Sequence, residues 1–240
     1  MNVFYRRFIK QPNQGKNMDD LKPETIKIVT PHANFRYSYF VTPDEYKGVK
    51  KYKGEVLIKT DAKMEIKNDN GTTSTVDAVP YIVSQLEGLL DRWKKALKER
   101  YPQRSFTLTK NKNGEPSYPW SFEEDNLVIK VSKKAGGIKQ NGDTWSNPPV
   151  TFFANEDPVR LMTDEERKQY EKISPETVGQ ISMKCSGYDA GANGVGIRCQ
   201  PMSICIRKFV PWTGGGADDF QVETTTSNFE EQTATSAADF

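Results

Sequence analysis

The stretch Asp77–Arg100, DAVPYIVSQLEGLLDRWKKALKER, decides the fold class, because it is the clearest helical pattern in a chain otherwise rich in strand-like runs. Asp77 is expected to cap the helix, Pro80 is tolerated in the first turn, and Tyr101-Pro102 ends it. The apolar residues recur at spacings of three and four, the period of an amphipathic helix. They are Val79, Ile82, Val83, Leu86, Leu89, Leu90, Trp93 and Leu97. This helix needs an apolar partner, and we expect a sheet.

Strand-like runs rich in β-branched and aromatic residues lie on both sides of this helix. They cover residues 25–29, 35–41, 52–59, 105–110, 127–132, 150–154, 180–188 and 195–210. A short second helix is expected to start at Thr163, where Glu166 completes a capping box, and to end before Pro175. Strands and helices do not alternate, so the pattern favours a mainly β, partly open barrel over an α/β layered fold.

Composition and motifs limit the classes of function that this chain can have. With 35% hydrophobic residues and a mean hydropathy of −0.73, the 240-residue chain predicts one modest core with polar loops or ends. It has no 18-residue apolar run and no secretory signal at its N-terminus, so we expect a soluble intracellular protein. One histidine, His32, and three cysteines without a C-x-x-C pair predict no metal, no cofactor and no enzyme activity.

The charges are unevenly distributed along the chain. All 34 Lys and Arg residues precede Gly214, whereas six of the 32 Asp and Glu residues follow it, so the body carries +8 and the tail −6. A basic body attracts polyanions, and a tethered acidic segment can occupy the same surface. We therefore expect a basic arm at 1–24, a folded domain at 25–213 and an acidic tail at 214–240.

Single-stranded nucleic-acid binders combine a basic groove with aromatic faces for base stacking. Basic and aromatic residues are interleaved in four segments of the body, and Trp145 stands in a polar loop where a core role is hard to assign. The candidate DNA-binding residues are Arg36, Tyr37, Tyr39, Lys130, Lys133, Lys134, Trp145, Lys184, Tyr188 and Arg198. Other interpretations stay open, because lysine pairs are typical of solvated turns and strand tyrosines are typical of cross-strand pairs.

Two further features have structural interpretations. The glycines between 187 and 196 join two strand-like runs and open no helix, so they predict a hairpin rather than a phosphate-binding loop. The three cysteines, Cys185, Cys199 and Cys205, stand among apolar strand residues and are expected to be small core residues.

The junction Phe209-Val-Pro-Trp-Thr-Gly-Gly-Gly-Ala-Asp-Asp-Phe220 and the terminus Asp239-Phe240 resemble the replication single-stranded DNA-binding protein of short-tailed coliphages. The stretches 38–44 and 52–58, the long helix and the Ser-Gly-Tyr188 strand end follow in the same order as in that family. Two departures are a less acidic tail, rich in Thr and Ser, and an insertion at 139–149 that leaves Trp145 outside the resemblance.

The resemblance implies an OB fold, a five-stranded barrel with one inserted helix and a disordered acidic tail, and no catalysis. It further implies that the protein coats and anneals single-stranded DNA in phage replication and recombination, in the cytoplasm of an infected bacterial host, with a homodimer as one possible state. By matching position, Asp218, Asp219, Asp239 and Phe240 would be the tail contacts with phage DNA polymerase and primase-helicase, and Lys130 and Tyr188 DNA contacts. A merely solubilising tail is the competing interpretation.

Two rival functions are considered. A phage virion or tail structural protein would explain the strands but not the separation of charge between body and tail. A nuclease could use Glu123, Glu124 and Asp125 to hold magnesium, but consecutive residues in a strand do not converge on one face.

Overall fold

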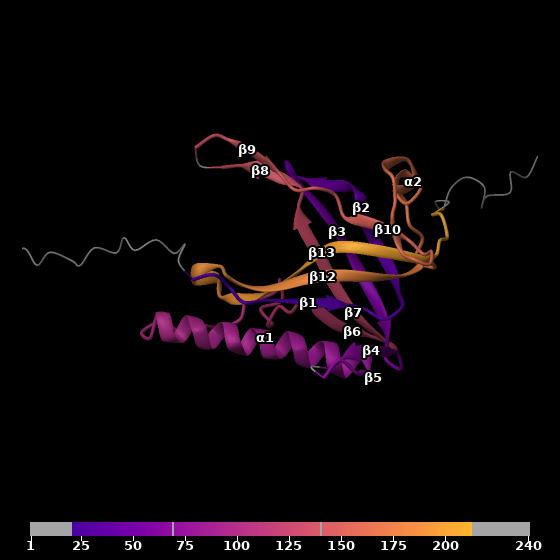
Figure 1. Cartoon of the computed structure of the whole chain (residues 1–240). Coiled ribbons are helices and arrows are strands. Elements are labelled where there is room, and N and C mark those ends of the chain that lie inside the picture. Colours follow the sequence, from indigo (N-terminus) through magenta and orange to yellow (C-terminus); the bar gives the residue numbers. More distant parts are fainter. Residues whose placement is uncertain (1–20, 69, 140, 213–240) are drawn as a thin grey trace, which may run out of the picture.

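The computed structural model describes residues 21–68, 70–139 and 141–212 (Figure 1). These residues form mostly strands, with a long helix α1 (Ala78–Arg100), a short helix α2 (Asp164–Lys168) and a 3₁₀ turn at Gly191–Asn193. The strands are β1 (Thr25–Val29), β2 (Ala33–Tyr46), β3 (Val49–Lys59), β4 (Lys63–Lys67), β5 (Thr73–Asp77), β6 (Trp120–Glu123), β7 (Asn126–Lys134), β8 (Gly136–Ile138), β9 (Thr144–Ser146), β10 (Thr151–Ala154), β11 (Arg160–Leu161), β12 (Val178–Asp189) and β13 (Val195–Lys208). The predicted mainly β fold with one amphipathic helix is confirmed.

Five strands pair in a closed ring in the order β2, β3, β7, β13, β12 and back to β2. All these pairings are antiparallel except that of β7 with β13, which meet in parallel at Val131 and Cys199. The ring closes where Gly179 of β12 pairs with Ala33 of β2. The OB fold is likewise built on a five-stranded barrel, and in this ring α1 is inserted between the second and third strands.

Further strands widen the barrel wall. β1 pairs with the outer edge of β12, β10 pairs in parallel with β13, β11 pairs with β10, and β6 pairs with β7. The sheet at β12 and β13 is therefore broader than a simple barrel wall. Two hairpins stand apart, β4 with β5 and β8 with β9, and the second extends beyond the barrel (Figure 1).

The barrel interior is filled by alternate residues of its strands, as expected for side chains that point to opposite faces in turn. Phe35 and Phe40 of β2 meet edge to face at 6.1 Å between ring centroids, and both are fully buried. Inward residues of the other strands complete this core, including Val56, Ile58, Leu127, Ile129, Ile181, Met183, Cys185, Ile197, Cys199 and Ile204. Cys185 and Cys199 are therefore core residues, as expected.

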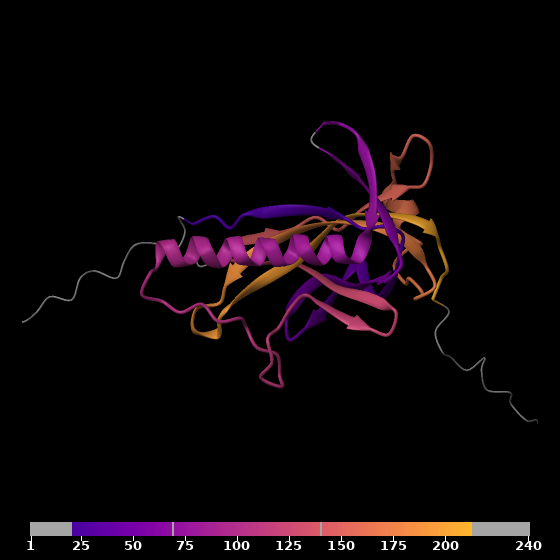
Figure 2. The ribbon, with the colours of Figure 1, turned by 90° about the horizontal axis from the view of Figure 1, so that it is seen from below.

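Helix α1 covers one side of the barrel: it runs below the strands in Figure 1 and in front of them in the view from below (Figure 2). Its apolar stripe is buried, with Leu86 and Leu89 fully inaccessible to solvent. Near its C-terminus, Trp93 packs directly on Gly187 of β12, and its indole Nε1 donates a hydrogen bond of 3.1 Å to the carbonyl oxygen of Tyr188. Gly187 is needed because a Cβ there would lie 2.3 Å from the indole ring.

Two of three further local predictions were wrong. Residues 105–110 form isolated bridges through Leu108 and Lys110 rather than a strand, because the chain turns at Asn111, whose side chain accepts hydrogen bonds from two following amides. The second helix has the predicted capping box and ends at Lys168, before Pro175 as predicted. Asp77 occupies the N-cap position of α1 without a capping hydrogen bond, because its carboxylate is paired with Lys63 of β4.

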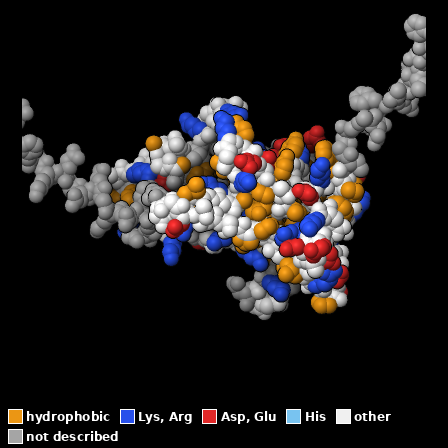
Figure 3. Space-filling view, turned by 90° about the horizontal axis from the view of Figure 1, so that it is seen from above, with side chains coloured by type: hydrophobic (Ala, Val, Ile, Leu, Met, Phe, Trp, Pro, Cys, Tyr) orange, Lys and Arg blue, Asp and Glu red, His pale blue; other side chains and the backbone are white. Residues whose placement is uncertain are grey.

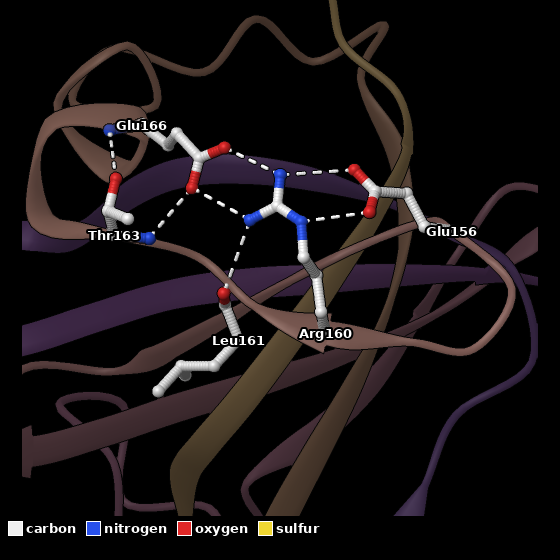
Figure 4. Close-up of polar contacts among 5 residues, drawn as sticks. All are labelled: Glu156, Arg160, Leu161, Thr163 and Glu166. Atoms are coloured by element: carbon white, nitrogen blue, oxygen red, sulfur yellow. Dashed lines mark hydrogen bonds and ion pairs between the residues drawn. The ribbon is translucent and has the colours of Figure 1, made fainter.

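The capping box of α2 belongs to a larger ion-pair cluster (Figure 4). Arg160 of β11 lies between Glu156 and Glu166 and hydrogen-bonds to both carboxylates at 2.6–3.1 Å. The hydrogen bonds that Glu166 accepts from Arg160 and, to a smaller extent, from the backbone amide of Thr163 lower its pKa to about 2. The cluster joins β11 to α2 across an otherwise irregular segment.

Parts of the predicted domain organisation lie outside the described residues. Of the predicted basic arm 1–24 only 21–24 are described, and the tail residues Asp218, Asp219, Asp239 and Phe240 are beyond residue 212. The boundaries at 24 and 213 therefore stay predictions.

The surroundings of Gly187 and Gly88 predict that replacing each of them by alanine changes the stability of the fold in opposite directions. Gly187→Ala is expected to destabilise the fold by about 1–3 kcal/mol or more, because the new methyl group overpacks the indole. Gly88→Ala, in the same helix–sheet unit, is expected to stabilise it by about 0.5–1 kcal/mol, because only the flexible Arg92 side chain lies near and alanine favours helix. Urea unfolding measures both, and equal effects would contradict the packing argument.

Candidate nucleic-acid interface

One basic side chain on each of five adjacent strands faces outward and forms what we call the basic band: Lys27, Lys184, Arg198, Lys130 and Lys53. Lys27 pairs with Lys184, and Arg198 and Lys130 directly precede the Cys199–Val131 pair. Neighbouring strands lie about 4.8 Å apart. The band crosses them with a two-residue offset between Lys184 and Arg198 and another between Lys130 and Lys53.

Most of the band lacks acidic partners. Lys53 is paired with Asp44 at 2.6 Å, whereas Lys27, Lys130, Lys184 and Arg198 form no ion pair with any described residue. Glu55 pairs in register with Lys130, but its carboxylate is bound by Arg36. The four unpaired cations are free to bind an anionic ligand.

Tyr188 continues this surface next to Arg198. Its strand position pairs with Gly196, two residues before Arg198, and its ring packs directly on that glycine. Its hydroxyl lies 2.9 Å from Oγ1 of Thr109. The ring is thus held in a fixed orientation and is partly exposed beside the band.

The turn after Tyr188 is held by a two-pronged ion pair. Both guanidinium Nη atoms of Arg104 lie 2.6 Å from the carboxylate oxygens of Asp189, and Asp189 also accepts a hydrogen bond from the amide of Gly191. The hydrogen bonds from Arg104 lower the pKa of Asp189. This pair ties the β12–β13 turn to the segment that follows α1, and the turn has the hairpin geometry predicted from its glycines.

The candidates on β2 have two different environments. Arg36 is bound to Glu55 at 2.6 Å and to Glu123 at 2.8 Å, and the hydrogen bond to Glu123 is the main cause of its raised pKa. Tyr37 and Tyr39 are exposed by 67% and 42%, so neither belongs to the core. The ammonium of Lys53 lies 5.3 Å from the centre of the Tyr39 ring, which places an aromatic face at one end of the band.

The remaining candidates lie where β7 continues into the β8–β9 hairpin. Lys133 packs over the ring of Tyr52, and this burial lowers its pKa. Lys134 is exposed, and Trp145 of β9 packs its indole against Gly137 of β8 with part of the ring accessible. Trp145 therefore stands on a projecting hairpin and outside the core.

The structure thus brings together Lys130, Lys184, Tyr188 and Arg198, with Tyr39 at the other end of the band, and places Lys133, Lys134 and Trp145 at the adjoining hairpin. Arg36 is instead occupied by two carboxylates. Lys27 and Lys53 were not among the sequence candidates. The alternation within Thr25–Val29 could have placed Lys27 on an outer face, but the sequence does not show that β1 pairs with β12.

One group of acidic side chains lies at helix α2. Asp164, Glu165 and Glu166 occupy the first turn of α2. Viewed from above, hydrophobic and basic side chains are intermixed over the surface, and the largest group of Asp and Glu side chains lies toward the end that carries α2 (Figure 3).

Other features of the described residues do not point to a reaction centre. A cavity of about 550 Å³ lies between β1 and the β4–β5 hairpin, but its Lys63 is already paired with Asp77. Among residues 21–212, apart from 69 and 140, no cluster of His, Cys, Asp or Glu has a metal-binding arrangement. No helix in these described segments is long and apolar enough to cross a membrane.

Comparison with known proteins identifies the fold. The structure is similar to the crystal structure of gp2.5, a single-stranded DNA-binding protein encoded by bacteriophage T7, with a TM-score of 0.58 and 13% sequence identity over 90% of this chain and 100% of that chain. A single-stranded DNA-binding protein from bacteriophage Enc34 gives a TM-score of 0.44 at 13% identity, over 80% of this chain and 86% of that one. No protein-family model and no curated protein sequence matches the chain.

The Arg104–Asp189 pair predicts a pH-dependent contribution to stability. Asp189→Asn is expected to destabilise the fold by about 1–3 kcal/mol near neutral pH, because it removes hydrogen bonds between charged groups. The folded-state pKa of Asp189 is lowered, so the difference should persist above the ordinary value of 3.8 and shrink as pH falls below it. Denaturant unfolding across pH measures this. Asp77→Asn, at an exposed ion pair, is the control and should cost less than about 1 kcal/mol.

Proposed function

We propose that this protein binds single-stranded DNA without sequence preference, along the basic band of its OB barrel. The main supporting observation is the basic band, in which five adjacent strands each contribute an outward-facing cation. Four of these cations have no ion-pair partner among the described residues. The shared fold with the T7 single-stranded DNA-binding protein supports the same function. A sequence-independent ligand needs contacts to phosphates, which every strand offers in the same spacing.

In this proposal the cations and the aromatic rings have separate roles. Lys27, Lys130, Lys184 and Arg198 bind successive phosphates, and binding releases the counterions that surround the nucleic acid. Tyr188, Tyr39 and Trp145 offer ring faces on which bases stack. Tyr188 is already oriented by Thr109 and Gly196, so little conformational entropy is lost when a base stacks on it. Tyr37, Lys133 and Lys134 are secondary candidates at the edges of this path.

The acidic tail has a regulatory role in the proposal. The tail occupies the basic band when DNA is absent, and so competes with DNA for it. When DNA is bound, the tail docks on phage DNA polymerase and primase-helicase through Asp218, Asp219, Asp239 and Phe240. The charge difference of +8 against −6 between body and tail supports the first part. A terminal phenylalanine beside a carboxylate suits a docking peptide, because its ring can be buried while the acid pairs with Lys or Arg.

The rival functions receive no comparable support. Of the three acids considered for magnesium binding, Glu123 is bound to Arg36, and Glu124 occupies the β6–β7 turn with a φ of 50°. A virion structural role has no observation of its own in this chain. A virion structural role leaves the unpaired cations of the band without a ligand.

The salt dependence of binding tests the band. Lys130→Ala and Arg198→Ala are each expected to weaken oligo-dT binding and to reduce the slope of log affinity against log salt by about 1, because each removes one phosphate contact. Fluorescence anisotropy over a salt series gives the slope. Lys95→Ala, on the exposed face of α1, makes the same charge change away from the band and should leave the slope unchanged.

Two results of the salt titration would contradict the proposal. If the slope of log affinity against log salt is the same for all three variants, the basic band does not bind DNA. Failure of the unmodified 240-residue chain to bind oligo-dT at low salt would refute single-strand binding altogether.

The competition by the tail is tested by deletion. Removing residues 214–240 is expected to tighten binding to oligo-dT at low salt and to abolish association with phage DNA polymerase, because the competing acids and the terminal Phe240 are lost. Titration and co-sedimentation measure the two effects. A full-length control with the six tail acids changed to Asn or Gln should also bind DNA more tightly, since it keeps chain length but not charge. Unchanged affinity in both variants would contradict the competition.

A further inference from the structure

A groove of about 460 Å³ lies beside the basic band, on the outer face of β1, β12, β13 and β10. Its floor is a row of small residues in register across three strands: Ser182 of β12 pairs with Ser203 of β13, which pairs with Thr151 of β10. Larger side chains flank this row, so the short floor side chains produce the hollow. Its volume is in the range of small-molecule binding sites.

A β-bulge forms one wall of the groove. The register between β12 and β13 shifts between Ser182 and Met183, which leaves Met202 as an extra residue in β13. Met202 is 45% exposed and lines the groove. Bulges re-aim side chains in this way. Phe153 of β10 also lines the groove, so an aromatic ring and a polarizable thioether join the hydroxyl groups in its lining.

The polar groups at the groove suit a nucleotide. Lys27 and Lys184 line one end, no carboxylate lines any part of it, and both lysines belong to the basic band. Ser182 is only 8% exposed, and its Oγ has no hydrogen-bond partner among the described residues. A buried hydroxyl without a partner carries a free-energy cost that a ligand atom can remove.

We propose that this groove is a nucleotide subsite that extends the DNA path beyond the barrel face. A base enters the groove between Met202 and Phe153, the floor hydroxyls hydrogen-bond to its polar edge, and the ammonium groups of Lys27 and Lys184 bind the adjoining phosphates. The inference rests on the proposed single-strand binding and adds to it a defined place for the end of the strand. Charge complementarity favours DNA as the occupant, because the lining has cations and no acids.

Introducing a negative or a positive charge at Met202 tests the subsite. This residue is exposed at a bulge, so its replacement does not disturb the packing of the core. Met202→Glu in the full-length chain is expected to weaken binding of a dT oligomer of about 16 nucleotides by about tenfold, and Met202→Lys to strengthen it. A dT oligomer of about 4 to 6 nucleotides, which the band alone can hold, should be affected less than about twofold by either change. Ser84→Glu and Ser84→Lys, on the exposed side of α1, are the matched controls.

The outcomes separate the subsite from the proposed function. If the unmodified chain binds neither oligomer, single-strand binding itself fails. If it binds both but Met202→Glu and Met202→Lys change short and long oligomers equally, the groove is not on the DNA path. A change in sedimentation coefficient without a change in the length dependence would assign the groove to contact between protein copies and would also overturn the subsite.

Discussion

The antiparallel pairing of β12 with β13 is the constraint on which the rest of the molecule depends. Together these two strands pair with four other strands of the wall: β12 pairs with β1 and β2, and β13 pairs with β7 and β10. The same pair seats Trp93 of α1 on Gly187. Because successive side chains alternate between faces, one register fixes both the buried core and the outward cations, so the core and the candidate DNA surface cannot be changed independently.

Ion pairs divide the basic residues into two groups. Arg36, Arg104 and Arg160 each bind carboxylates within 3 Å and hold strands, a turn and a short helix in place. The unpaired cations of the basic band have no such partners among the described residues, and they face outward. Arginine and lysine can both bind phosphates, so the two groups differ in whether a carboxylate already occupies the cation. The stabilising and the ligand-binding charges are therefore different residues.

Much of the fold was predictable from local patterns. The helix at 78–100, most of the strands, the capping box at Thr163 and the hairpin turn near Gly191 follow from periodicity and turn chemistry, which act over a few residues. Local patterns failed where distant contacts decided the outcome. The Asp77 carboxylate pairs with Lys63 of β4 instead of capping the helix, and residues 105–110 form only isolated bridges, through Leu108 and Lys110.

The sequence by itself determined that the protein is a mainly β domain with one covering helix and a basic body, since composition and periodicity report on burial and charge. It also indicated Lys130, Lys184, Tyr188 and Arg198 as binding candidates. Only the tertiary structure decided that these residues share one surface with Lys27, that Arg36 is occupied by Glu55 and Glu123, and that a bulge at Met202 opens a groove. The physical reason is that strand neighbours in a barrel are set by pairings between distant segments, such as Lys27 with Lys184, which no local pattern records.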